Sequence, residues 1–137
     1  MFAKAVQFCV WMDNHEGAFG EFCELFYENG IDIIAMSLRG DSEVGVLRMV
    51  VDAPDRAREL LSKSGLNFRQ TEVLLVEVPN RAGMAAGVGH RFSQAGIDIE
   101  YAYFSAGPSD APARMVFKVR DIDAALSKLH ESSRKYN

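Results

Sequence analysis

The stretch Gly30-Ile31-Asp32-Ile33 occurs a second time, unchanged, as Gly96-Ile97-Asp98-Ile99, at an offset of 66 residues. The triplet Arg48-Met49-Val50 recurs at the same offset as Arg114-Met115-Val116. Further identical pairs at this offset are Asn14 and Asn80, Gly17 and Gly83, and Phe26 and Phe92. Because no gap is needed to keep the pairs in register, the sequence predicts an internal repeat. We divide the chain into two repeat domains, residues 1–70 and residues 71–137.

Each repeat predicts the same series of strands and helices. In the first repeat, apolar and polar residues alternate over 6–12, as in a half-buried strand, whereas the apolar residues of 19–26 have the spacing of one helix face. The remaining predicted elements are a strand from 31, a strand over 44–51, a helix from 54 and a strand over 67–70 that runs into 72–78. The order is βαββαβ in the first repeat, so the predicted fold class is α+β.

The second repeat looks truncated at its end. After Leu129 the remaining residues, 130–137, are polar and do not alternate, so a full fourth strand is not expected there. The inner strand at 72–78 would then have an unpaired edge unless the tail, a partner chain or a rearranged neighbour covers it. Because exposed strand edges pair readily, we expect a homodimer.

Composition and charge exclude several classes of function. The chain has 15 Lys and Arg against 19 Asp and Glu, a net charge of −4, and no basic stripe, so we do not expect a nucleic-acid partner. The apolar stretches, such as Ala5–Met12, are much shorter than the roughly 20 residues that span a bilayer, so no membrane segment is expected. The N-terminal residues do not resemble a secretory signal, which predicts a cytoplasmic protein.

Catalytic and metal-binding patterns are missing from the sequence. The histidines His15, His90 and His130 are not repeated between the halves, and no common nucleophile or phosphate-loop motif occurs. Cys9 and Cys23 lack metal-ligand spacing. We therefore predict that the protein is not an enzyme and binds neither a cofactor nor a metal. A small ferredoxin-like enzyme remains an alternative if His15 packs against an acid in a closed pocket.

The repeated polar residues indicate a different chemistry. Asn14 and Asn80 each stand before a glycine that opens a helix, where free backbone N–H groups favour an anion. Asp32 and Asp98 lie between isoleucines at the start of an apolar strand, an unusual place for an acid without a cationic partner. An anion site and an acid together complement the carboxylate and ammonium of a free amino acid. An asparagine that only fixes its loop is the alternative.

These residues, in this order, resemble the ACT domain: Asn-x-x-Gly opens a helix, and Gly-Ile-Asp-Ile begins the second strand, all within βαββαβ. The resemblance covers nearly the whole chain, twice, and is greatest to small tandem ACT proteins. It implies two ferredoxin-like units side by side. It also implies that the paired units bind an amino acid at their interface and regulate enzymes of amino-acid metabolism. Such an enzyme would be a separate chain. A protein-interaction module without a small ligand is the alternative.

The resemblance also implies roles for individual residues. Asn14 and Asn80 match the loop asparagine that holds the ligand, and Gly17 and Gly83 match the glycine that opens the helix. Asp32 and Asp98 match the residue supplied across the interface, which gives two expected sites, Asn14 with Asp98 and Asn80 with Asp32. The first loop departs from the family pattern because it carries Glu16, an acid that disfavours a nearby anion. The sequence does not identify the amino acid.

Overall fold

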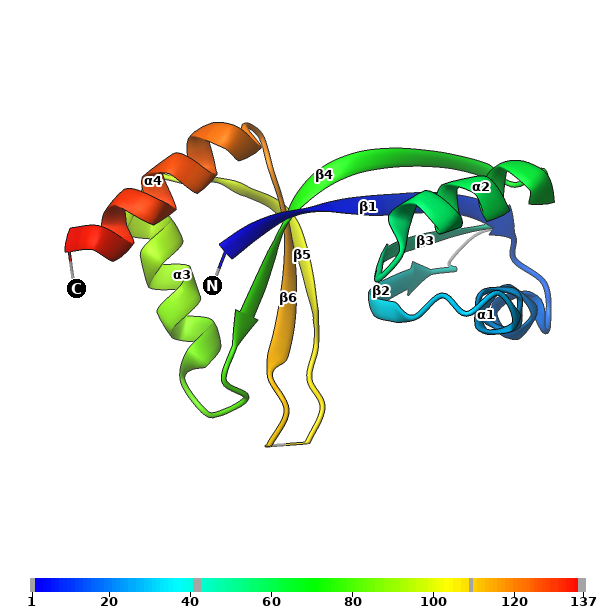
Figure 1. The fold of residues 1–137 in the computed structure, drawn as a ribbon, viewed down its shortest axis with the longest axis horizontal. Coiled ribbons are helices and arrows are strands. Elements are labelled where there is room, and N and C mark those ends of the chain that lie inside the picture. The colour runs from blue at the N-terminus through cyan, green and yellow to red at the C-terminus, as the bar shows by residue number, and fades with distance from the viewer. Residues whose placement is uncertain (1, 41–42, 109, 136–137) are drawn as a thin grey trace. The chain divides into compact units, whose positions relative to one another are not determined.

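The computed structural model describes residues 2–40, 43–108 and 110–135, with backbone only for residues 132–135. Contacts divide the chain into two compact units (Figure 1). The N-unit is Val6–Thr71, and the C-unit combines Met1–Ala5 with Glu72–Asn137. The predicted ranges, 1–70 and 71–137, place residues 2–5 with the first repeat, whereas the contacts place them with the second.

The N-unit contains the predicted βαββαβ series. Its elements are the later part of β1 (Phe2–Asp13), α1 (Ala18–Glu28), β2 (Ile33–Arg39), β3 (Val44–Val51), α2 (Pro54–Ser64) and the start of β4 (Asn67–Val78). The strand order is β2-β3-β1-β4, and β1 runs antiparallel to β3 with Phe8 opposite Met49. Alternate residues of these strands are buried together with Phe22 and Phe26 of α1 and Leu61 of α2, which form the core. The unit is therefore ferredoxin-like, as predicted.

The C-unit has the same plan but takes its fourth strand from the other end of the chain. Its elements are the later part of β4, α3 (Met84–Gln94), β5 (Ile99–Ser105), β6 (Ala113–Val119), α4 (Ile122–Lys135) and the first residues of β1. The strand order is β5-β6-β4-β1. In the described part of the chain α4 runs to Lys135, so no strand follows it; residues 136 and 137 of the predicted tail lie outside the described residues. The edge of β4 that we expected to be unpaired is covered by the chain's own N-terminal segment.

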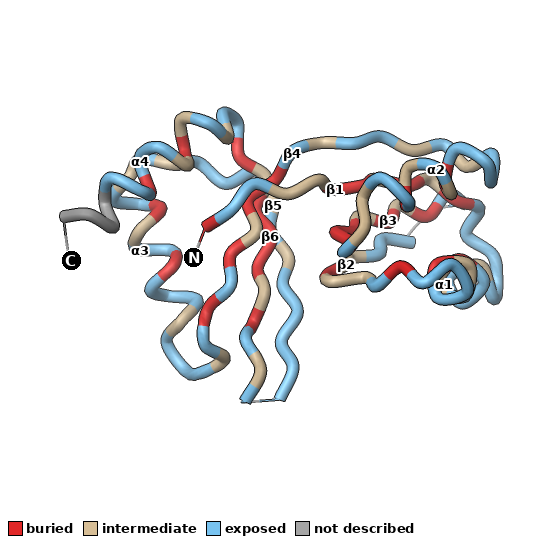
Figure 2. Tube along the Cα trace, viewed as in Figure 1, coloured by how far each residue is buried: buried red, intermediate tan, exposed pale blue. Residues whose placement is uncertain are grey.

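The N-terminal segment is held by apolar and ionic contacts within the C-unit. The Phe2 side chain is buried, and its ring centroid lies 5.9 Å from that of Phe92. Lys4 Nζ lies 3.0 Å from Glu72 Oε2 and 2.7 Å from Asp123 Oδ1. Figure 2 shows buried residues along β4, the strand next to this segment. Strand β1 is 12 residues long because its two ends belong to different units.

The repeated Gly-Ile pair ends the first helix of each unit. Gly30 and Gly96 adopt positive φ angles of 67° and 68°. Ile31 N then donates to Phe26 O at 3.0 Å, and Ile97 N donates to Phe92 O at 3.0 Å, which is the hydrogen bond of a Schellman cap. The first residue of the repeated block therefore stops a helix, and the isoleucine after it starts the path to the next strand.

Candidate functional site

Two asparagine side chains tie the loop before each first helix to a neighbouring hairpin. Asn80 Nδ2 donates to Gly107 O at 2.7 Å and to Pro108 O at 3.3 Å. Asn14 Nδ2 donates to Gly40 O at 2.7 Å. Both asparagines thus have the loop-fixing role that was the alternative to ligand contact. The Asn80 Nδ2 group thus already donates to backbone carbonyls. Among the described residues no donor is hydrogen-bonded to Asn80 Oδ1, so this oxygen could accept a hydrogen bond from a ligand.

The helices that follow these loops open with glycines in a left-handed conformation. Gly17 has φ 86° and Gly83 has φ 89°, and neither helix has a side-chain cap. A Cβ on Gly83 would meet nothing within 4 Å, so space is open over the start of α3. The first hydrogen bond within helix α3 is donated by Gly87 N to Gly83 O at 3.0 Å. Ala85 and Ala86 precede Gly87 in the first turn, where the backbone N–H groups have no carbonyl acceptor within the helix.

A surface hollow of 440 Å³ lies at the loop that leads into α3. Its lining residues are Glu77, Val78, Pro79, Asn80, Arg81, Asp110, Ala111 and Pro112. Glu77 is paired with Arg114 on the neighbouring strand β6, with Glu77 Oε1 3.1 Å from Arg114 Nε. Arg81 adds a positive charge, and the first turn of α3 contains no acid, so this end of the helix favours an anion.

The chemistry of this hollow is that of a zwitterion site. A carboxylate in the hollow can accept hydrogen bonds from the Arg81 guanidinium, and the N-terminus of α3, which follows this loop, adds a favourable dipole. An ammonium group can donate to Asn80 Oδ1 and to the Asp110 carboxylate, which lines the same hollow. Groups of both signs therefore border one space within the C-unit.

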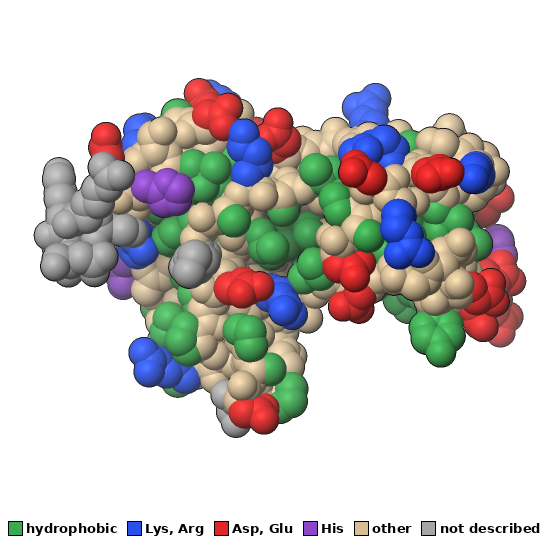
Figure 3. Space-filling view, in the orientation of Figure 1, with side chains coloured by type: hydrophobic (Ala, Val, Ile, Leu, Met, Phe, Trp, Pro, Cys, Tyr) green, Lys and Arg blue, Asp and Glu red, His purple; other side chains and the backbone are tan. Residues whose placement is uncertain are grey.

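The corresponding loop of the N-unit has the opposite charge. His15 stands where the C-unit has Arg81, and Glu21 lies in the first turn of α1. Glu21 Oε1 would lie 3.7 Å from a Cβ built on Gly17, so a carboxylate already occupies the approach to this helix. In Figure 3 acidic side chains gather over the end of the N-unit where α1 lies. This loop is therefore less suited to an anion than the loop around Asn80.

The two predicted acids lie at the other end of their units. Asp32 N donates to Asp52 Oδ1 at 2.9 Å, and Asp52 N donates to Asp32 O at 3.0 Å, which joins the start of β2 to the end of β3. Strand β2 separates Asp32 from the Asn14 loop by roughly 20 Å at about 3.3 Å per residue. Asp98 is exposed and lines a hollow of 150 Å³ with Arg120 and Lys128. The structure does not bring the asparagine and the aspartate of one unit together; the predicted pairs, each of which combines two units, stay predictions.

The remaining candidate groups form no catalytic arrangement among the described residues. His15 is exposed, and its Nδ1 lies 3.0 Å from the Glu16 backbone oxygen, not against an acid in a closed pocket. Burial raises the pKa values of the Cys9 and Cys23 thiols, which keeps them protonated at neutral pH. In the described part of the chain no group of three His, Cys, Asp or Glu side chains could hold a metal ion, and no described helix is long and apolar enough to cross a membrane.

The sequence analysis did not identify Arg81 and Asp110 as site residues. Arg81 directly follows Asn80, and its counterpart is His15, so a comparison of the repeats for differences rather than identities would have found it. Asp110 belongs to the turn between β5 and β6, and only the fold brings that turn to the Asn80 loop.

Two ferredoxin-like units with this helix-opening loop define an ACT-type tandem. The chain matches the family model described as ACT domain pair over residues 3–128. It therefore belongs to the ACT domain pair family. None of the curated proteins compared with the chain matches it.

Solved structures share this fold over almost the whole chain. Protein BT0572 from Bacteroides thetaiotaomicron is 26% identical, with a TM-score of 0.83, and the match covers 96% of this chain and 90% of that one. The regulatory subunit of aspartate kinase from Thermus thermophilus, in a ligand-free form, is 15% identical, with a TM-score of 0.64 and 95% of each chain covered. The aspartate kinase of Clostridium acetobutylicum is 11% identical, with a TM-score of 0.54, and the match covers 98% of this chain but 34% of that enzyme.

Proposed function

We propose that this protein is a regulatory module that binds a free amino acid between ACT units and passes the bound state to an enzyme of amino-acid metabolism on a separate chain. The observation that carries the proposal is the hollow at Asn80, where the Arg81 guanidinium can donate to a carboxylate and the loop leads into the N-terminus of α3. Regulatory subunits of aspartate kinase share the fold, which supports a regulatory role. A change in affinity for the partner on ligand binding would transmit the signal.

The loop of the C-unit is the stronger of the two proposed sites. The Gly83 approach is open and free of acids in the helix turn, whereas Glu21 lies over Gly17. We therefore propose that the pair Asn80 and Asp32 binds the ligand more tightly than the pair Asn14 and Asp98. In both pairs the aspartate would come from another ACT unit and bind the ammonium group of the ligand. In the Asn80 site it would do so together with Asn80 Oδ1 and Asp110.

The site would be completed by a second ACT unit, which a homodimer can supply as well as the tandem itself. The β4 edge gives no argument for a dimer, because the N-terminal segment covers it. We also propose a cytoplasmic location. No nucleic acid or membrane is part of the proposal.

A thermal-shift screen of the standard amino acids on the purified protein tests the proposal. A ligand at 100 times its dissociation constant stabilises the native state by about 2.7 kcal/mol, a readable shift. We expect one selective amino acid, whose shift is lost in Arg81→Gln and in Asp32→Ala. His15→Gln, at the matching position of the first repeat, is the control and should keep the shift.

Two results would contradict this function. If no amino acid shifts the unfolding temperature at millimolar concentration, a protein-interaction module without a small ligand becomes the better interpretation. If a hit survives Arg81→Gln unchanged, the carboxylate site lies elsewhere.

A further inference from the structure

Strands β2 and β5 each have an outer edge. In the order β2-β3-β1-β4-β6-β5, each of the two has one neighbour, so its other edge pairs with no described strand. Both strands are seven residues long, and each carries an exposed apolar side chain, Leu38 on β2 and Ile99 on β5. Strand edges of this kind pair readily with another strand.

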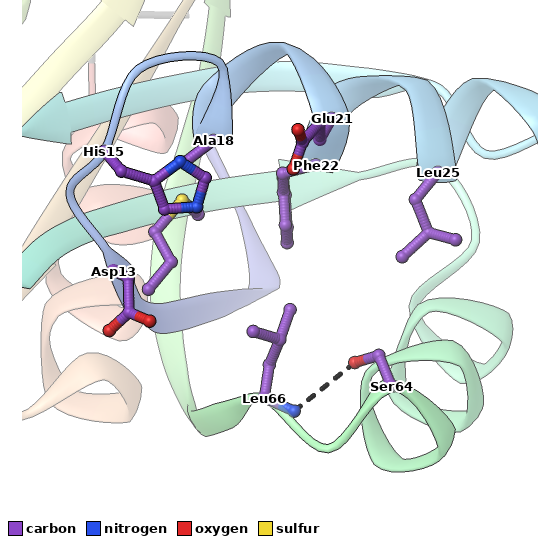
Figure 4. Close-up of a pocket in the computed structure, with 9 residues that line it drawn as sticks. Asp13, His15, Ala18, Glu21, Phe22, Leu25, Ser64 and Leu66 are labelled. Carbon is purple, nitrogen blue, oxygen red and sulfur yellow. Dashed lines mark hydrogen bonds between the residues drawn. The ribbon is translucent and has the colours of Figure 1, made fainter.

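Helix α1, which leads to β2, has a bulky apolar stripe. Phe19, Cys23 and Tyr27 follow one another at intervals of four residues, so they lie along one side of the helix. Phe19 is 43% exposed and Tyr27 is 81% exposed. The opposite side of α1 faces the end of α2, where the side chains of Leu25 and Leu66 point toward one space (Figure 4). The stripe therefore lies on the surface, on the side of α1 away from α2.

Helix α3, which leads to β5, has small side chains at the matching positions. Ala85, Gly89 and Ser93 lie 66 residues after the three members of the α1 stripe, and all three are exposed. A Cβ built on Gly89 would meet no atom within 4 Å, so a second helix can approach closely there. Because large side chains pack well against small ones, the two helix surfaces are complementary in size.

The same two helices are complementary in charge. Helix α1 contains the acids Glu21, Glu24 and Glu28 and has no Lys or Arg. Helix α3 has no acid and carries His90 and Arg91. Two α1 helices side by side would repel each other, whereas α1 beside α3 brings unlike charges together. Size and charge therefore both favour α1 of one copy next to α3 of a second copy.

The strands that follow these helices match in register. Met36 and Ala102 are the central residues of β2 and β5. Each lies opposite a core residue of the inner strand, Met49 and Phe117, so both side chains are on the face that the helices cover. When the two strands overlap antiparallel over their full length, Met36 faces Ala102, again a large residue against a small one.

This register brings Asp32 of one copy to the Asn80 loop of the other. Asp32 directly precedes β2, so it falls opposite Ala106, which directly follows β5. The next residue, Gly107, accepts the hydrogen bond from Asn80 Nδ2 at 2.7 Å. Two β2 strands paired with each other would instead bring Asp32 to the loop of Asn14.

We propose that β2 of one copy pairs antiparallel with β5 of a second copy, so that one chain supplies Asp32 to the hollow at Asn80 of the other. The opposite end of the same junction brings Asp98 beside Gly40, whose carbonyl accepts the hydrogen bond from Asn14. In a two-fold dimer the junction occurs twice. The role of Asp32 rests on the proposed function, whereas the pairing of the strands does not.

Disulfide trapping tests which strands pair. Met36→Cys and Ala102→Cys chains are mixed in urea, refolded together and oxidised with diamide. We expect a disulfide between positions 36 and 102 of two chains, because facing strand residues are close enough to form one. Each variant oxidised alone is the matched control, since position 36 meets itself only in a β2–β2 pair and position 102 only in a β5–β5 pair. Peptide mass spectrometry identifies the linked residues. A link of either position to itself, or no link between the two, would overturn the proposal.

Ala102→Lys tests the junction without a new thiol. The parent should sediment at about twice its chain mass of 15.2 kDa. A lysine at the exposed centre of β5 should raise the dissociation constant of the dimer at least about tenfold, because a charge at a strand edge opposes pairing. Ser127→Lys, at an exposed position of α4, is the control and should leave the dimer intact. A monomeric parent, or an unchanged Ala102→Lys dimer, would overturn the proposal.

These measurements need no amino acid, so they succeed or fail independently of the proposed function. If the strands pair as described but no amino acid shifts the unfolding temperature, the pairing stands and the amino-acid site falls. If a monomeric Ala102→Lys variant keeps a shift that Asp32→Ala abolishes, Asp32 acts within its own chain and the proposed role of the second copy is wrong.

Discussion

Lys4 Nζ lies 2.7 Å from Asp123 Oδ1, so a residue of the first strand is paired with a residue of the last helix. The same ammonium group lies 3.0 Å from Glu72 Oε2 on the strand beside it. Both contacts are inside the C-unit, whose fourth strand is therefore fixed by charge at Lys4 and by apolar packing at Phe2.

Phe2→Ala should destabilise the protein by about 3 kcal/mol, because a buried aromatic ring is removed from the C-unit core. Urea unfolding followed by circular dichroism measures the loss. Phe104→Ala is the matched control, since Phe104 is 63% exposed and its removal should change stability little. Equal effects of the two substitutions would show that the N-terminal strand does not pack as described.

Gly83→Ala should destabilise the protein by about 1–2 kcal/mol, because the alanine must adopt φ 89°. Gly87→Ala should instead be neutral or stabilising, by up to about 1 kcal/mol, because Gly87 is helical and a Cβ there meets no atom within 4 Å. Thermal unfolding of the two variants measures both signs. A stabilised Gly83→Ala would contradict the left-handed opening of α3.

Arg91→Leu should destabilise the C-unit by about 2 kcal/mol, since a charged hydrogen bond to Leu129 O and a cation–π contact with Phe2 are lost together. Arg91→Lys keeps the charge and should lose less. Chemical denaturation compares the two variants. If Arg91→Leu is as stable as the parent, the arginine does not bridge the helices in solution.

The ion pairs of Lys4 predict that the stability of the folded protein falls at strongly alkaline pH. Hydrogen bonds to Asp123 and Glu72 raise the pKa of Lys4 above its ordinary 10.5. A raised folded-state pKa means that this contribution is complete below pH 10.5 and is lost as the pH rises through the folded-state pKa. Unfolding temperatures measured from neutral to strongly alkaline pH should therefore fall more steeply in the parent than in Lys4→Met. Parallel curves would contradict the pairing.

The cysteines should react slowly with an alkylating reagent at neutral pH. Burial raises the pKa values of both thiols, so the reactive thiolate is scarce in the folded protein. Mass spectrometry after iodoacetamide treatment should find both cysteines modified more slowly in the native than in the urea-unfolded protein. Fast labelling of native Cys23 would place it in a more open environment than α1 provides.

Repeat comparison predicted most of the fold because each identity has a local physical cause. The Gly30 and Gly96 pair ends two helices, and the alternating strands bury one face. The position of Phe2–Ala5 could not be predicted in this way, since local alternation does not say which unit a strand joins. Loop asparagines were found from the sequence, but their hydrogen bonds to Gly40 and Gly107 required the hairpins to be placed. The role of Arg91 could not be predicted in this way, because the repeat comparison uses identical residues and Arg91 lies where the two repeats differ.

The shared strands impose an order on folding during synthesis. Every residue of the N-unit, Val6–Thr71, leaves the ribosome before residues 72–137, the larger part of the C-unit, begin to appear. The C-unit, in contrast, needs the first residues of β1 together with α4, so Phe2–Ala5 must wait for its partners until α4 has been synthesised. A permuted chain that starts at Glu72 and joins the end of α4 to Phe2 would give each unit a contiguous sequence and remove this delay.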